Sequence, residues 1–285
     1  MARILLSAFA DEYSPDFATQ LSALGRHGIS YIEPRFIGEK NVADLTEFEA
    51  RAIRAEMDAV GISAYSVGSP IGKISLDDPM EPHLQRAENC FRAARILGAS
   101  RVRVFSFYIP EGRSRSECAP EVFSRMERLL DLADKYGVTL CHENEAGIFG
   151  ESPESCLELL SAFGGRLRAV FDMGNFVLDG CEPYPFGYSL LRDYIDYFHI
   201  KDSLAAGAIV PPGLGEARIA EILAEYLSEG EDFVVTLEPH LETFSGLNAL
   251  VGKSFENPYK FESPESAFDE AAERIKRIIA DVSEL

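Results

Sequence analysis

Short apolar runs alternate along the chain with stretches of helical periodicity. Strand-like runs occupy positions 4–9, 30–34, 62–67, 101–107, 138–145 and 233–239, and two further runs end at Asp172 and His199. Helical spacing of apolar residues predicts helices at 15–28, 44–60, 82–97, 120–136, 153–163, 184–194, 216–227 and 263–282. The Ser14-Pro15 pair indicates an N-cap followed by the first helical residue. Eight strand–helix units predict a (β/α)₈ barrel, with a doubly wound open sheet as the alternative.

The last four strands share a polar ending. They read VTLCHENE, RAVFDMGN, YFHIKD and FVVTLEPH, and each apolar run stops at a side chain able to bind a metal: Glu143, Asp172, His199 and Glu238. Because a closed barrel directs strand ends toward one axis, these four side chains should converge, whereas an open sheet would spread them apart. Side-chain alternation also places Lys201 on the side of His199, and Glu145 on the side of Glu143.

Composition narrows the choice of compartment and partners. The 285 residues, of which 46% are hydrophobic, are enough for one barrel domain over 1–285, with loop insertions near 203–215 and 240–262. A formal charge of -20 argues against nucleic acid as a partner, although much of it is typical of solvated helix surfaces. Five cysteines without CxxC spacing, and an N-terminal apolar run too short for a signal peptide or membrane span, predict a cytoplasmic protein with no membrane partner.

Motifs along the whole chain resemble one superfamily. They are SAFADE near the start, GSPIGKI after the third strand, VRVFSFY on the fourth, HENE on the fifth, FDMGNF on the sixth, HIKD on the seventh and LEPH on the eighth. Together with the order Glu, Asp, His, Glu, they resemble the xylose isomerase-like barrels, or sugar phosphate isomerase/epimerase superfamily. Because that superfamily hosts several chemistries, the resemblance implies the fold more narrowly than the reaction.

The resemblance implies a metal-dependent isomerase or epimerase of a small sugar or sugar derivative. Glu143, Asp172, His199 and Glu238 would bind one divalent cation, with Mn²⁺ or Mg²⁺ favoured by the oxygen-rich ligand set and Co²⁺, Ni²⁺ or Zn²⁺ also able to bind. Glu143 and Glu238 would also be the acid/base pair, transferring protons through a metal-bound enediolate. The alternatives are dehydration of a sugar acid or inosose at the same site, and a ligand-binding barrel without catalysis. Relatives are often dimers or tetramers, so a homo-oligomer is compatible with the resemblance.

Several further residues are candidates for substrate binding. They are Lys201, Asn175, Lys73, Arg35, Glu145 and Tyr108. Asn175 stands where many relatives have a histidine, and its amide can form hydrogen bonds but does not titrate near neutral pH. Lys201 has a structural alternative, an ion pair with Glu143 or Asp172. An apurinic endonuclease is disfavoured, because that chemistry needs a histidine-rich zinc cluster and a basic groove, and this chain has five histidines and an acidic balance.

Overall fold

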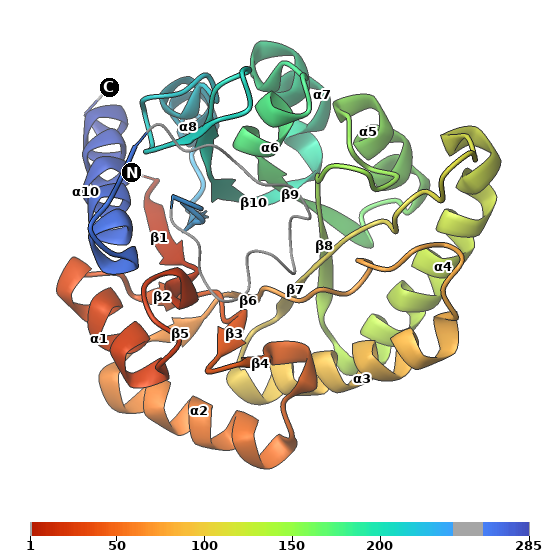
Figure 1. The fold of residues 1–285 in the computed structure, drawn as a ribbon, viewed down its shortest axis with the longest axis horizontal. Helices are drawn as coiled ribbons and strands as arrows, with labels where there is room; N and C mark the ends of the chain where they lie inside the picture. The colour runs from red at the N-terminus through yellow and green to blue at the C-terminus, as the bar shows by residue number, and fades with distance from the viewer. Residues whose placement is uncertain (1, 242–258, 285) are drawn as a thin grey trace.

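The computed structural model describes residues 2–241 and 259–284, and parallel strands form its centre (Figure 1). Seven strands pair in the order β1-β13-β10-β9-β8-β7-β6. Their bounds are Ile4–Ala8 (β1), Ser66–Val67 (β6), Arg101–Val104 (β7), Thr139–Glu143 (β8), Leu167–Asp172 (β9), Ile195–Ile200 (β10) and Phe233–Leu237 (β13). The first and last strands of the chain are neighbours, with Ile4 opposite Phe233, as a barrel requires.

The ring is completed by β2 (Tyr31–Ile32) and β5 (Ser63–Ala64). The predicted third strand is divided at Tyr65: β5 pairs with β2, and β6 pairs with β7. On the other side of β2, the backbone N–H of Glu33 donates to the carbonyl of Ala8 at 3.1 Å. These contacts join all eight predicted strand positions in one ring, which confirms the (β/α)₈ barrel rather than the open sheet.

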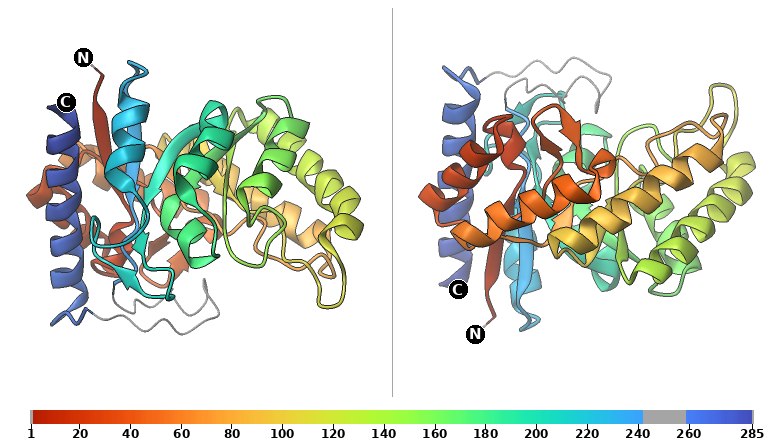
Figure 2. Two further views of the ribbon diagram at one scale, coloured as in Figure 1. Left: turned by 90° about the horizontal axis from the view of Figure 1, so that it is seen from above. Right: turned by 90° about the horizontal axis from the view of Figure 1, so that it is seen from below.

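Helices surround the strands, and the last of them lies alongside β1 with both chain ends at one end of the barrel (Figure 2). The helices are α1 (Phe17–His27), α2 (Glu47–Val60), α3 (Met80–Leu97), α4 (Arg115–Tyr136), α5 (Pro153–Ala162), α6 (Met173–Leu178), α7 (Tyr188–Leu191), α8 (Ile219–Leu227) and α10 (Pro264–Ser283). Their apolar faces and the outer faces of the strands form one large core cluster.

Several helix starts differ from the prediction by one to five residues, and two of them show the physical reason. Helix α1 begins at Phe17, because the carboxylate of Asp16 accepts the N–H of Thr19 and Asp16 is therefore the N-cap in place of Ser14. Helix α4 begins at Arg115, five residues before the predicted start at Pro120. The preceding Ser114 forms a reciprocal capping box with Glu117, which satisfies the first backbone donors of the helix.

Other differences lie in the connections. Helix α6 follows directly on β9 and was not predicted, and the predicted helix 184–194 is broken into short turns around α7. The predicted loop 203–215 contains the second strand of a hairpin, β11 (Asp202–Ser203) with β12 (Ile209–Val210). Of the predicted insertion 240–262, residues 242–258 lie outside the described residues.

Asp202 fixes the connection that follows this hairpin. Its carboxylate accepts the backbone N–H groups of Ser203, Gly213, Gly215 and Ala217 at 2.8 to 3.1 Å. A Cβ at Gly215 would lie 2.1 Å from Oδ1 of Asp202, so this approach requires glycine. The connection is thus an ordered structure built around one buried carboxylate.

The barrel interior changes from apolar to polar along the strands. Cys141, Val170, Tyr197 and Val234 form a small buried cluster of their own. Two residues further along the same strands, on the same side, stand Glu143, Asp172, His199 and Thr236. An apolar layer therefore supports the polar strand ends.

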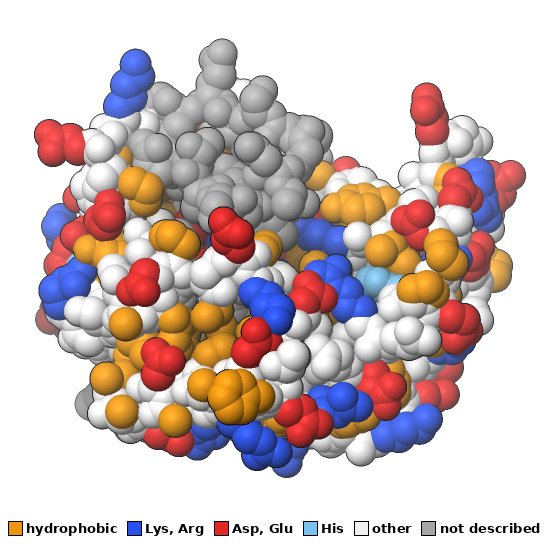
Figure 3. All heavy atoms as spheres, turned by 60° about the horizontal axis from the view of Figure 1, so that its bottom comes forward, with side chains coloured by type: hydrophobic (Ala, Val, Ile, Leu, Met, Phe, Trp, Pro, Cys, Tyr) orange, Lys and Arg blue, Asp and Glu red, His pale blue; other side chains and the backbone are white. Residues whose placement is uncertain are grey.

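The described surface carries charges of both signs. Acidic and basic side chains are interspersed over the face drawn in Figure 3, as expected for solvated helix surfaces. The five cysteines are unpaired. Within residues 2–241 and 259–284, every helix is too short or too polar to cross a membrane.

Candidate active site

The four predicted metal-binding side chains converge at the carboxyl ends of the strands. Glu143 and Asp172 end β8 and β9, His199 lies near the end of β10, and Glu238 directly follows β13. Each residue is at most 2% exposed. One potential ligand atom from each lies within 4.8 Å of those from the other three. The structure thus brings together side chains from four strands that span 96 positions of the sequence.

His199 is held at both ring nitrogens by carboxylates. Nδ1 lies 3.2 Å from Oε1 of Glu143 and 3.3 Å from Oε2 of Glu238. Nε2 lies 3.3 Å from Oε2 of Glu33, whose other oxygen accepts the hydroxyl of Tyr197 at 2.8 Å. We assign the Nε2 proton to the bond with Glu33, the arrangement in which a histidine presents Nδ1 to a metal ion.

The ligand set fits a divalent cation. Nδ1 of His199 and Oε2 of Glu143 are buried and form no hydrogen bond of acceptable geometry with the described residues, although ionic contacts lie at 3.2 Å. Buried polar atoms in this condition are unfavourable unless a cation or a proton compensates them. Three carboxylates and one imidazole are suitable ligands for Mg²⁺, Mn²⁺ or Zn²⁺. The buried cluster could therefore bind a metal ion.

Burial and neighbouring charges act against each other on the carboxyl groups. In the metal-free protein, burial lowers the pKa of His199 but the charges of Glu143 and Glu33 raise it well above its usual range, so the ring is a cation, and a metal ion at Nδ1 would replace its second proton. Burial raises the pKa of Glu143, but the positive charges of His199 and Arg103 outweigh it and hold the pKa of Glu143 at about 2. Burial raises the pKa of Glu238, but Lys201 and His240 lower it, and the pKa of Glu238 lies well below its usual range. Burial dominates at Asp172 and raises its pKa to about 7 despite Lys201. Both glutamates are therefore ionised near neutral pH.

Lys201 and Asn175 lie beside the cluster. Nζ of Lys201 is 3.0 Å from Oδ2 of Asp172, 3.1 Å from Oδ1 of Asn175 and 3.3 Å from Oε2 of Glu238. The backbone N–H of Asn175 donates to the other Asp172 oxygen, because Asp172 is the N-cap of α6. The predicted ion pair of Lys201 with Asp172 is confirmed, and α6 fixes the position of Asn175.

Three other candidates, Lys73, Glu145 and Tyr108, are linked to one another outside the convergent set. Nζ of Lys73 pairs with Oε2 of Glu145 at 2.8 Å and lies 4.3 Å from the centre of the Phe105 ring. Burial raises the pKa of Tyr108, and the charge of Glu145 raises it further. Glu145 is thus engaged by Lys73 and lies outside the convergent set, while Glu143 lies within it.

Arg103 is a site residue that the sequence reasoning missed. It is 2% exposed, and Nη1 lies 3.2 Å from Oε2 of Glu143 and 3.8 Å from Oε1 of Glu238. The available signal was the run RVRV at 101–104, in which arginines alternate with valines and therefore share one side of the strand. Arg35, a substrate-binding candidate, is 1% exposed and also contacts Glu238.

The loop GSPIGKI, which carries Lys73, is anchored by His83 of α3. The N–H of Gly72 donates to Nε2 of His83 at 2.8 Å, and a Cβ at Gly72 would lie 1.9 Å from the carbonyl oxygen of Phe105. The N–H of Ile71 donates to the hydroxyl of Ser69. These backbone donors are used within the protein, so the loop is a tight turn and the two N–H groups are not free to bind a phosphate.

His83 should make stability fall in mild acid. Burial, followed by the charges of Arg86 and Arg125, lowers its pKa from 6.5 to about 4. In the unfolded chain the His83 side chain binds a proton more readily than in the folded protein. The contribution of neutral His83 to the free energy of unfolding is therefore complete above about pH 6.5. It decreases as the pH falls toward 4, by at most ~3 kcal/mol. Urea unfolding between pH 4 and 7 measures how the free energy of unfolding depends on pH. His83→Gln, whose side chain can still accept the N–H of Gly72, should reduce this dependence. An unchanged dependence would contradict the role given to His83.

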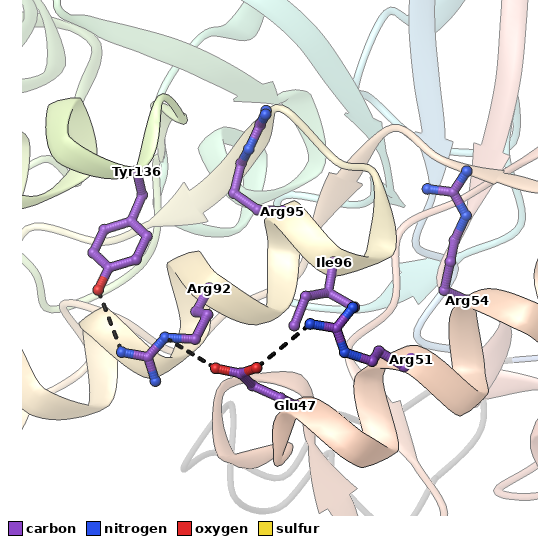
Figure 4. A pocket seen from close by; sticks show the side chains of 7 residues that line it. All are labelled: Glu47, Arg51, Arg54, Arg92, Arg95, Ile96 and Tyr136. Carbon is purple, nitrogen blue, oxygen red and sulfur yellow. Dashed lines mark hydrogen bonds and ion pairs between the residues drawn. The ribbon is translucent and has the colours of Figure 1, made fainter.

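A hollow of about 490 Å³ lies on the outer helical layer between α2 and α3 (Figure 4). Its lining residues are Glu47, Arg51, Arg54, Arg92, Arg95, Ile96 and Tyr136. Glu47 pairs with both Arg51 and Arg92 at 3.6 Å, and Arg92 donates to the hydroxyl of Tyr136 at 3.3 Å. Because these residues stand on helices rather than at strand ends, the hollow is separate from the buried cluster.

The fold and this strand-end cluster are those of an α/β barrel with a candidate metal centre. Residues 21–278 match the family described as xylose isomerase-like TIM barrel. The chain therefore belongs to that family, which confirms the resemblance seen in the sequence. No curated protein sequence matches the chain.

Solved structures with the same fold are distant in sequence. A D-psicose 3-epimerase with D-tagatose from Clostridium cellulolyticum H10 has 13% identity and a TM-score of 0.73, covering 98% of this chain and 99% of that one. A xylose isomerase-like TIM barrel protein from Mycobacterium smegmatis in complex with magnesium has 16% identity and a TM-score of 0.70, covering 100% and 97%. The IOLI protein with a bound zinc atom has 16% identity and a TM-score of 0.74, covering 98% and 99%. At these identities the likeness establishes the fold alone.

Proposed function

We propose that the protein is a divalent-metal-dependent isomerase or epimerase of a small sugar or sugar derivative. The observation that carries this proposal is the arrangement at His199. Its Nδ1 faces Glu143 and Glu238 at 3.2 and 3.3 Å, while Glu33 holds Nε2. Two buried carboxylates close to one imidazole nitrogen provide a metal ligand set and a pair of proton acceptors in the same place. The epimerase among the structures of the same fold supports the reaction class.

In this proposal Glu143, Asp172, His199 and Glu238 hold the cation. When bound, the cation supplies Lewis-acid stabilisation of negative charge on substrate oxygens. Glu143 and Glu238 are ionised near neutral pH, so either can accept a proton from a carbon next to a carbonyl group. The other glutamate is ionised as well, so it must first take up a proton before it can return one to the substrate.

Neighbouring residues orient the substrate and supply protons. Nζ of Lys201 is 3.3 Å from Oε2 of Glu238, so it lies on a route by which that glutamate can regain a proton. In this proposal Lys201 and Asn175 contact substrate oxygens near the cluster, and Lys73, Glu145 and Tyr108 contact the remainder of the substrate.

The substrate should be an uncharged polyhydroxylated carbonyl compound rather than a sugar phosphate. Lys73 is paired with Glu145 at 2.8 Å, and Lys201 with Asp172 at 3.0 Å. A phosphate would have to compete with these carboxylates for each ammonium group, whereas hydroxyl groups can donate to the acids and accept from the amines.

Proton exchange with deuterated water tests the function. Metal-stripped protein is reloaded with Mn²⁺ or Mg²⁺ and incubated with a panel of ketoses and their phosphates, and NMR follows deuterium at the carbon next to the carbonyl. We expect metal-dependent exchange with an unphosphorylated ketose, accompanied by its epimer or aldose. Loss of water from the substrate would identify a dehydratase. Absence of both metal binding and exchange would leave a non-catalytic barrel.

Glu33→Gln should weaken metal binding without removing a ligand. Glu33 orients His199 through Nε2, and loss of such a carboxylate typically costs ~10–100-fold in metal affinity. Calorimetric titration with Mn²⁺ measures the change. Glu145→Gln is the matched control, because it removes the same charge from a residue paired with Lys73, and its Mn²⁺ affinity should remain that of the wild type. Equal affinities in all three proteins would contradict the proposed orientation of His199.

A further inference from the structure

A second group of potential metal ligands lies directly beside the first. Glu12, Glu238 and His240 are all buried and have ligand atoms within 4.8 Å of one another. Nε2 of His240 is 3.4 Å from Oε1 of Glu12 and 3.3 Å from Oε1 of Glu238. Glu238 belongs to both groups: Oε2 faces His199, and Oε1 faces His240. Two metal ions sharing a carboxylate in this way typically lie ~3.5–4 Å apart.

The side chain of Arg35 occupies the second group. Its Nη1 lies 2.9 Å from Oε1 of Glu238 and 3.4 Å from Nε2 of His240. Nη2 donates to Glu12 at 3.2 Å, and Nε donates to Asp11 at 2.8 Å. The guanidinium is fully enclosed and also lies 4.4 Å from the centre of the Phe9 ring. One arginine thus bridges three carboxylates and one imidazole nitrogen.

We propose that Arg35 takes the place of a second divalent cation and keeps the metal centre mononuclear. Three buried carboxylates need a cation, and a guanidinium supplies the charge and the directed donors in a form that cannot dissociate. Because Arg35 holds Oε1 of Glu238, only Oε2 remains directed at His199. Arg35 is thus a positioning residue for Glu238 rather than a contact of the substrate, which replaces the role expected from the sequence.

Removing the guanidinium should create a second metal site. In Arg35→Ala, Glu12, Glu238 and His240 keep their places around a space that lacks its cation. We expect two Mn²⁺ per chain by elemental analysis and calorimetry, against one for the wild type. Electron paramagnetic resonance of the Mn²⁺-loaded variant should show exchange coupling between two ions, a signal independent of enzymatic activity. Arg35→Gln provides a second variant that retains more side-chain volume.

Two further variants separate this proposal from a general effect of charge. Arg103→Met also removes a buried cation next to Glu238 but faces Glu143, so it should bind no additional ion. Arg35→Ala/His240→Ala lacks a ligand of the second group and should return to one ion. Circular dichroism shows whether a variant folds only when Mn²⁺ is present. Such a variant would support the proposal if, once folded, it holds one ion more than the wild type.

The result that would overturn the inference is equal metal content in Arg35→Ala, Arg35→Gln and the wild type, whether that content is zero or one. Two ions in the wild type would overturn it as well. The inference uses the mononuclear centre of the proposed function, but the two fail differently. A wild-type protein that binds no metal contradicts the proposed function. The proposed role of Arg35 is tested by the difference in the number of bound metal ions between the Arg35 variants and the wild type.

Discussion

Glu143→Gln and Glu238→Gln should each reduce turnover by ~10²–10⁴-fold, the usual contribution of a positioned acid or base. Each substitution removes a proton acceptor and also one negative charge from the ligand set around His199, so metal affinity should fall too. The two effects are separated by measuring turnover at saturating Mn²⁺, where the loss of the proton acceptor remains. The ketose that shows metal-dependent exchange with the wild type is the substrate for this comparison.

The two variants should differ in what they retain. If the two glutamates serve opposite faces of the substrate, the variant that keeps the first proton acceptor still exchanges the substrate proton with deuterated water but forms no product. The other variant loses both exchange and product. Loss of both reactions in one variant, together with full activity in the other, would point to a single glutamate as both acid and base. Wild-type turnover and metal affinity in both variants would exclude this site as the catalytic centre.

Arg103→Met should destabilise the metal-free protein by ~3–5 kcal/mol, the cost of removing one partner from a buried ion pair. Arg103 is 2% exposed and contacts Glu143 and Glu238, which lose a compensating charge while remaining buried. Methionine conserves much of the volume, so the main change is electrostatic. Urea unfolding of metal-stripped protein at neutral pH measures the difference.

The matched control is Arg86→Met, the same substitution at a surface ion pair. Arg86 pairs with Asp44, and the two side chains are 39% and 43% exposed. An exposed pair typically contributes ~0–1 kcal/mol, so this variant should unfold nearly as the wild type does. If the two variants lost the same stability, the positive charge of Arg103 would not be needed to balance the glutamates.

Periodicity alone was enough to predict the barrel and the position of its candidate centre. Apolar runs of strand length separated by amphipathic helices define eight repeating units, and the polar residues at the ends of the last four runs are Glu143, Asp172, His199 and Glu238. Alternation then assigned Lys201 to the side of His199. These are local properties of the chain, and the symmetry of a closed barrel converts them into a convergent cluster.

Local signals were less reliable at element boundaries. The pair Ser14-Pro15 resembles a helix start, but the Asp16 carboxylate caps α1. At α4, the capping box of Ser114 and Glu117 moves the start upstream of Pro120. Several capping residues compete within a few positions, and the hydrogen bond that forms depends on how the preceding segment enters the helix.

The identity of the ion-pair partners was decided by the tertiary structure. Arg103 with Glu143, Lys73 with Glu145, and Arg35 with Asp11, Glu12 and Glu238 join residues up to 203 positions apart. A sequence shows which charges face the barrel interior, but pairing depends on distances of about 3 Å set by the packing of several strands. The sequence therefore determined which side chains gather at the strand ends, and the packing determined which of them remain available for a metal ion and which are already balanced by an arginine or lysine.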